Sequence, residues 1–126
     1  MKVFMEQLIN GLTVGSFYAL VALGYSMVYG VMKLINFAHG DLFTLGSYLG
    51  YTFLVWGASW ITQSVGPWWG MAMAVGFVFL ANAGAGIVVE RVAYRPVYAA
   101  GRLPLVVSPL GMSIFIQNGI MALWGP

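Results

Sequence analysis

Long runs of apolar residues, separated by short polar segments, make up most of the chain. Four runs stand out, at about residues 8–31, 42–60, 68–89 and 105–124. Each is close to the roughly 20 residues with which a helix crosses the hydrocarbon core of a bilayer. Transmembrane strands are not expected, because the runs are too long and do not alternate apolar with polar residues. A backbone in lipid must satisfy its own hydrogen bonds, so the pattern predicts an all-α, polytopic bundle of about four spans.

The composition supports a protein embedded in the lipid bilayer. Of the 126 residues, 61% are hydrophobic and only 6% are charged. Soluble domains carry about 25% charged residues, so this chain has too few ionic groups to cover a surface in water. The formal charge of +2 is small and scattered, so we expect no nucleic-acid partner.

Catalysis and metal binding find little support in the residue types. The chain has one histidine, three acidic residues and no cysteine, which is a poor set of metal ligands. Serine and threonine are present, but no general base stands near them in a readable pattern. We therefore expect no enzyme activity, no metal site and no cofactor.

Charge in the connecting segments indicates the orientation. Segment 57–67 carries no charged residue, whereas segment 90–104 contains Arg91, Arg95 and Arg102. The positive-inside rule places the arginine segment in the cytoplasm, and it places the uncharged segment and the N-terminus outside. All five tryptophans would then lie at the outer interface, where indole rings prefer to sit.

Small residues recur at a spacing of four in three of the spans: Gly11 and Gly15, Gly46 and Gly50, and Ala72 and Gly76. Membrane helices use more glycine than soluble ones in general, but we favour close helix packing as the cause. Within the four spans, stripes such as Gly46 and Gly50 have no obvious partner helix. In the fourth span, Gln117 and Asn118 predict hydrogen bonds between helices rather than contact with a solute.

The segment NFAHGD, residues 36–41, interrupts the apolar pattern. Gly40 weakens a helix, and Asn36 or Asp41 could cap a helix that restarts here. One interpretation is a capped turn at the cytoplasmic surface. The other is a broken or re-entrant helix near residues 33–41 that lines a solute path. These physical features favour neither interpretation over the other. His39 and Asp41, two residues apart, would not share a helix face.

Three motifs resemble one family. They are GVMKLINFAHGD at residues 30–41, ERVAYRPV at 90–97 and SPLGMSIFIQN at 108–118. In this order, and over nearly the whole chain, they resemble the permease subunits of branched-chain amino-acid ABC importers. The resemblance implies a multi-pass inner-membrane importer in which two permease subunits form the pathway. It also implies two ABC ATPase subunits and a periplasmic solute-binding protein that delivers leucine, isoleucine, valine or a related solute such as urea or an amide.

The resemblance also bears on the interrupted segment and on the length. It makes Asn36, His39, Gly40 and Asp41 candidates for lining or shaping the substrate pathway. Because family members are considerably longer, we expect residues 1–126 to be the N-terminal part of a transmembrane domain that cannot transport alone. The chain would then be a fragment, a split gene product or a truncation. The alternative is a small oligomeric channel or structural membrane subunit, which would need no ATP.

Overall fold

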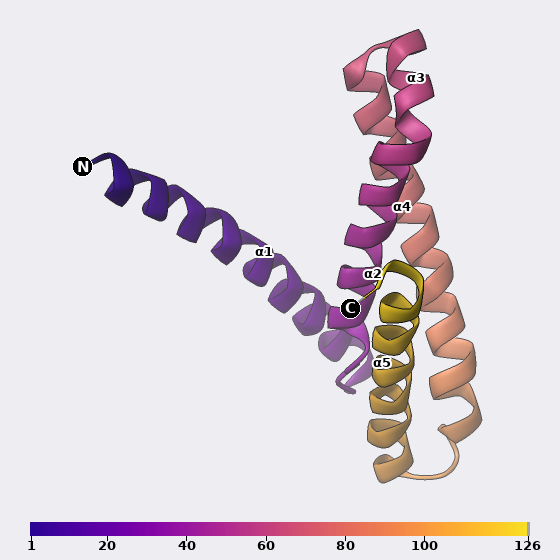
Figure 1. Cartoon of the computed structure of the whole chain (residues 1–126). Helices are drawn as coiled ribbons and strands as arrows, with labels where there is room; N and C mark the ends of the chain where they lie inside the picture. Colours follow the sequence, from indigo (N-terminus) through magenta and orange to yellow (C-terminus); the bar gives the residue numbers. More distant parts are fainter. Residues whose placement is uncertain (126) are drawn as a thin grey trace.

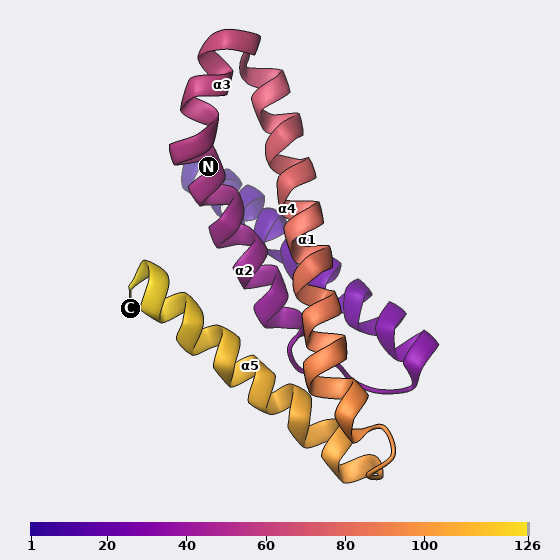
Figure 2. The same ribbon diagram turned by 90° about the vertical axis from the view of Figure 1, so that its right-hand side faces the viewer.

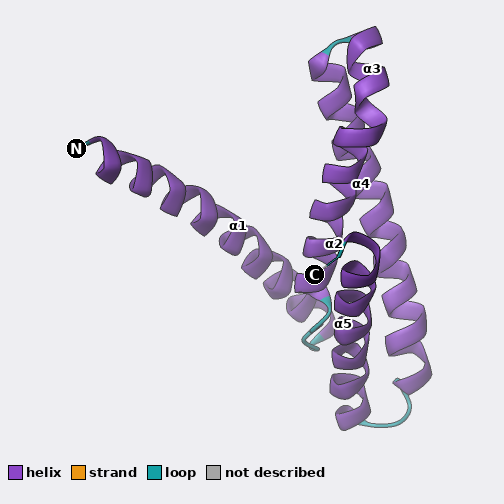
Figure 3. Ribbon diagram, in the orientation of Figure 1, coloured by secondary structure: helices purple, strands orange, loops and turns teal. Residues whose placement is uncertain are grey.

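Every regular element in the described part of the chain is helical. The computed structural model describes residues 1–125, and Figure 3 shows helices joined by short loops. The elements are α1 (Lys2–Met32), α2 (His39–Thr52), the π-helix η1 (Phe53–Gly57), α3 (Ala58–Val65), α4 (Pro67–Val89), the π-helix η2 (Glu90–Tyr94), the 3₁₀-helix η3 (Arg95–Val97) and α5 (Arg102–Trp124). The predicted all-α architecture is confirmed.

Within residues 1–125, three helices are long and apolar enough to cross a membrane: Lys2–Met32, Pro67–Val97 and Arg102–Trp124. The remaining apolar run, 42–60, is covered by α2, η1 and α3, which follow one another without a loop. Together these three elements exceed the roughly 20 residues that a span requires. The chain is thus a multi-pass membrane protein, and a fourth span at 42–60 stays a prediction.

The two segments predicted as loops between spans are largely helical. In segment 57–67, helix α3 continues to Val65, and Gly66 makes the turn with φ 94° before Pro67 opens α4. In segment 90–104, η2 and η3 extend α4 to Val97, and the non-helical residues are 98–101. Gly66 can adopt this left-handed conformation without strain, and proline suits the first turn of a helix because no helical bond needs its missing N–H.

Helix α2 is the central element of the structure. It packs against α1, α4 and α5, and α4 runs back beside α2 and α3 (Figures 1 and 2). Helix α1 leaves this group at an angle, as Figure 1 shows, and none of its residues is buried. The chain therefore forms an open assembly in which α1 is splayed from the other helices.

A small core lies where the interruption between α1 and α2 meets the connection from α4 to α5. Its buried members are Ala38, Val89, Ala93, Tyr94 and Leu105. Ala38, between the two helices, has no exposed surface. The interruption is therefore buried at Ala38, whereas Lys33, Ile35 and Phe37 of the same segment are exposed.

Candidate functional site

The predicted interruption of the helix is present between α1 and α2. Helix α1 ends at Met32, and Lys33 takes the left-handed conformation with φ 55° while its N–H donates to the Tyr29 carbonyl oxygen at 2.9 Å. A single left-handed residue of this kind is a common way to terminate a helix. Residues 33–38 are not helical, and Gly40 lies inside the first turn of α2. The break thus occurs before Gly40, and Lys33 takes the turning conformation.

The expectation that Asn36 or Asp41 caps the restarted helix is wrong. The N-cap of α2 is Ala38, and no side chain caps this helix. Asn36 Oδ1 accepts a hydrogen bond from the Ala38 N–H at 3.1 Å, which closes a local turn ahead of the helix. Asp41 lies in the first turn, where the helix dipole favours an acid, but its carboxylate is directed to another helix.

The Asp41 carboxylate joins α2 to α5. Gln117 Nε2 donates to Asp41 Oδ1 at 2.9 Å, and Ser113 Oγ donates to Asp41 Oδ2. Gln117 therefore bonds between helices, as predicted. For Asn118 the described residues show a bond within α5 instead, from its Nδ2 to the Ile114 carbonyl oxygen at 2.7 Å, so the same prediction for Asn118 stays a prediction.

The opposite side of the same turn is held by α1. The His39 ring lies edge-on to the Tyr25 ring with centroids 5.0 Å apart. It also packs over Gly24, where an added Cβ would lie 2.8 Å from His39 Cε1. The Gly40 N–H donates to the Tyr25 hydroxyl at 3.4 Å. His39 and Asp41 thus contact different helices, as their spacing of two residues predicts.

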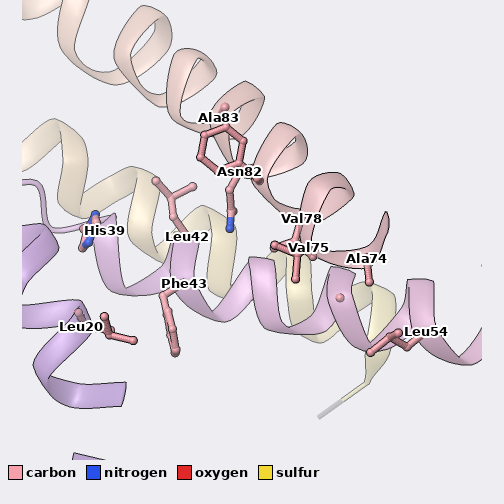
Figure 4. Close-up of a pocket in the computed structure, with 13 residues that line it drawn as sticks. Leu20, His39, Leu42, Phe43, Leu54, Ala74, Val75, Val78, Asn82 and Ala83 are labelled. Carbon is pink, nitrogen blue, oxygen red and sulfur yellow. The ribbon is translucent and has the colours of Figure 1, made fainter. Parts of the chain in front are cut away.

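A groove of about 700 Å³ opens between α1, α2 and α4, beside His39. Its lining is almost entirely apolar, and its two polar side chains are His39 from α2 and Asn82 from α4. Figure 4 shows Asn82 reaching from α4 toward α2, in the same part of the groove as Leu42. The Asn82 Oδ1 atom is buried and has no hydrogen-bond partner.

Sequence reasoning missed Asn82, although the sequence carries a signal for it. Asn82 is the only amide side chain in α4, in the most hydrophobic of the candidate spans, which has a mean hydropathy of 2.0. A lone amide in such a helix is costly in lipid and therefore points to a helix contact or to a site. Its neighbour across the contact is Gly46 of α2, where an added Cβ would collide with Asn82 Nδ2.

The Gly46 and Gly50 stripe packs closely against α4. At Gly50, an added Cβ would lie 3.1 Å from Val78 Cγ2. This confirms the packing interpretation for that stripe and corrects the expectation that it lacks a partner helix. Among the described residues, Gly11, Gly15 and Gly76 have no neighbour within 4 Å of such an atom, so those stripes stay open.

The side chains at the break and in the groove make hydrogen bonds and packing contacts between helices. The Asp41 carboxylate is met by two neutral donors, Ser113 and Gln117. Within the described residues, no three side chains of the His, Cys, Asp or Glu types gather closely enough to hold a metal ion. This arrangement can fix the angle and register at which α1, α2 and α5 meet.

Comparison with known proteins gives consistent matches. The chain is 45% identical over 118 residues to the high-affinity branched-chain amino acid transport system permease protein BraD of Pseudomonas aeruginosa, covering 94% of this chain and 38% of BraD. It is 44% identical over 117 residues to the corresponding protein LivH of Escherichia coli, covering 91% of this chain and 37% of LivH. LivH of Salmonella typhimurium is also 44% identical over 117 residues, with the same coverage. No solved structure matches the chain significantly.

The chain therefore spans less than two-fifths of the length of these relatives. A family model described as the permease component of branched-chain amino acid transport systems matches residues 7–124, which is nearly the whole chain. All three motifs singled out above fall within that match, and the chain belongs to this family of permease components.

Proposed function

We propose that this chain is part of the membrane-spanning permease of an ATP-driven importer for branched-chain amino acids or related small solutes. The observation that carries the proposal is the family match over residues 7–124, which includes the break and all the helices that surround it. The relatives BraD and LivH are named for branched-chain amino acid transport, which favours leucine, isoleucine and valine as solutes.

The partners follow from the same proposal. ABC ATPase subunits, a second permease subunit and a periplasmic solute-binding protein would complete the importer in the inner membrane. The N-terminus would lie outside, because Arg91, Arg95 and Arg102 all lie in segment 90–104, which the positive-inside rule places in the cytoplasm. Because the chain corresponds to 38% of BraD, transport would also need the remainder of a permease.

Within this permease, the break would shape the solute pathway through Asn36, His39, Gly40 and Asp41. Irregular backbone occurs at membrane depth only where protein buries it or where it lines a cavity, and transporters place such breaks at their pathways. Support comes from the burial of Ala38 and from the contacts that hold this turn on two sides. The four residues would position α2 relative to α1 and α5.

A chimera tests the function. Residues 7–124 of this chain replace the matched part of BraD, and the chimera is reconstituted in liposomes with the ATPases and binding protein of that importer. We expect ATP-dependent accumulation of radiolabelled leucine by the chimera and none by the 126-residue chain alone. A change between two access states needs free energy from a partner, here ATP hydrolysis. Uptake that proceeds equally without ATP would favour a channel instead.

The same chimera tests the role of the break. Asp41→Ala removes the acceptor for Ser113 and Gln117, so the initial rate of uptake should fall while membrane abundance stays near normal. Ser47→Ala is the matched control, since among the described residues the Ser47 hydroxyl bonds only to the Phe43 carbonyl oxygen of its own helix at 3.0 Å. Equal loss of uptake and abundance in Asp41→Ala would support a purely structural role for this turn.

A further inference from the structure

Polar side chains follow the contact between α2 and α5. Ser113 is the midpoint of the candidate span Arg102–Trp124, so the Asp41 carboxylate that it bonds belongs close to the middle of the bilayer. About two and three turns further along the same face of α2, Tyr48 packs against Trp124 with ring centroids 5.5 Å apart, and Thr52 accepts the Trp124 N–H at 2.8 Å. This polar strip consists of Asp41, Tyr48 and Thr52 of α2 and of Ser113, Gln117 and Trp124 of α5.

The Asp41 carboxylate is the one acidic group of the polar strip. Among the described residues its partners are two neutral donors, Ser113 Oγ and Gln117 Nε2, and no Lys or Arg side chain pairs with it. An acid inside a membrane protein is costly, and such residues are usually paired or mark the path of a substrate or an ion. Neutral polar side chains are sufficient to join two helices in lipid. Helix packing therefore does not explain why this position carries an acid.

The hydrogen bonds within the cluster of Asp41, Ser113 and Gln117 use all of its donors. Ser113 Oγ donates to Asp41 Oδ2, and Gln117 Nε2 donates to Asp41 Oδ1 at 2.9 Å and to Ser113 Oγ at 3.4 Å. A carboxylate has about four acceptor positions, so Asp41 keeps about two of them, and the amide oxygen of Gln117 remains a further acceptor. Gln117 is exposed and Asp41 is half-buried. The cluster can therefore still bind a group that donates hydrogen bonds.

We propose that the cluster of Asp41, Ser113 and Gln117 binds the ammonium group of an amino-acid solute that passes along α2 and α5. An ammonium group carries three donors and a positive charge, so its bonds to Asp41 would be charge-assisted and about twice as strong as those of a neutral donor. The inference rests on the proposed function for the identity of the solute, and it narrows the solute class to amino acids. Urea and simple amides carry no positive charge and would bind this cluster less tightly.

Two other roles fit the cluster less well. The carboxylate end of a solute is an acceptor, and the cluster has acceptors and the Asp41 carboxylate to offer it, so that end would be repelled. A role limited to joining α2 and α5 would be served equally well by a neutral amide at position 41. Exchange of Asp41 for Asn therefore separates a binding role from a packing role.

Photolabelling of the chimera described above tests this site. The chimera is reconstituted in liposomes with its ATPases, but without ATP and without the binding protein. It is then irradiated with photo-leucine, a leucine analogue that carries a diazirine in its side chain. We expect the label on residues of α2 and α5 close to Asp41 and Gln117, located by mass spectrometry. Labelling confined to other parts of the permease, or labelling that excess leucine does not suppress, would overturn the proposal.

Competitors identify the end of the solute that the cluster holds. Isoamylamine is leucine without its carboxyl group, and isocaproate is leucine without its amino group. Isoamylamine should suppress the labelling near Asp41, whereas isocaproate and urea at the same concentration should leave it unchanged. Suppression by isocaproate or urea as strong as that by isoamylamine would contradict the assignment of an ammonium group.

A substitution tests the role of the charge. Asp41→Asn keeps the shape of the side chain, and labelling near Gln117 should fall about tenfold or more, the loss expected for a hydrogen bond to a charged group. Ser47→Ala is the matched control, because Ser47 lies on α2 but lines a hollow toward α1, and its labelling should not change. Unchanged labelling in Asp41→Asn would show that Asp41 only joins the helices. The competitor pattern needs no substitution, so it decides the question even where Asp41→Asn fails to reach the membrane.

Uptake by the same chimera separates this inference from the proposed function. ATP-dependent accumulation of leucine without labelling near Asp41 would refute the ammonium site and leave the transport function intact. Labelling near Asp41 with the expected competitor pattern, but without ATP-driven uptake, would support the site and refute the function.

Discussion

The Trp124 indole Nε1 donates a hydrogen bond to Thr52 Oγ1 at 2.8 Å, which joins the C-terminal ends of α2 and α5. These two residues are 72 positions apart, and so are Asp41 and Ser113, which join the same helices near the start of α2. An equal separation at both contacts means that α2 and α5 pack in one register. Figure 1 shows that the two helices run in the same direction. The two contacts fix both the direction and the register of this helix pair.

The first prediction concerns this bond. Thr52→Val keeps the shape of the side chain but removes the acceptor for Trp124, so it should lower the free energy of unfolding by about 0.6 kcal/mol, the average for such bonds in membranes. Unfolding in detergent micelles measures it, and a double-mutant cycle with Trp124→Phe isolates the pair. Thr44→Val is the control, because the one bond of the Thr44 hydroxyl in the described part of the chain is within its own helix, to the Gly40 carbonyl oxygen. A coupling energy of zero would show that the bond does not stabilise the pair.

The second prediction concerns the contact between Gly46 and Asn82. Gly46→Ala would place a Cβ against Asn82 Nδ2, so either the Asn82 side chain must rotate or the helices must shift, at a cost of about 1–3 kcal/mol of the free energy of unfolding. Asn82→Ala should relieve this cost in the double variant. Gly76→Ala is the matched control on α4, where an added Cβ meets nothing within 4 Å. Equal effects of Gly46→Ala and Gly76→Ala in micelles would contradict the close approach.

The third prediction concerns the end of α1. Lys33 has a φ of 55°, which glycine adopts freely and a β-branched residue adopts at a cost of about 1–2 kcal/mol or more. Lys33→Gly should therefore keep or raise the thermal stability, whereas Lys33→Val should lower it. The two variants remove the same charge, so each serves as the control for the other. Equal melting temperatures would argue against a left-handed residue at this position.

The fourth prediction concerns orientation. Ser64 in α3 and Ala100 after η3 are both exposed and lie in the uncharged and the arginine-containing connections. The chain has no native cysteine, so Ser64→Cys and Ala100→Cys can be labelled singly in intact cells with an impermeant thiol reagent. We expect labelling at position 64 and none at position 100 until the cells are permeabilised. The reverse pattern would place the N-terminus in the cytoplasm.

Much of the secondary structure could be predicted from the sequence. The predicted runs 68–89 and 105–124 correspond to α4 (Pro67–Val89) and α5 (Arg102–Trp124), and the interruption near residues 33–41 is present. Helices in lipid must satisfy their own backbone, so the length of an apolar run is a strong predictor of a helix. The helical stretches beyond the runs were missed, because polar or interfacial residues can continue a helix without lengthening the apolar pattern.

The partners of the polar side chains were decided by the tertiary structure. The sequence by itself determined that Asp41 and Gln117 were costly in a membrane and would need hydrogen bonds. It did not determine that they bond to each other, nor that Asn82 faces Gly46 with its oxygen unpaired. Those pairings depend on how each helix is rotated about its axis and how far it slides along its neighbour. Rotation and sliding are set by contacts between residues distant in sequence, which no local pattern of apolar and polar residues specifies.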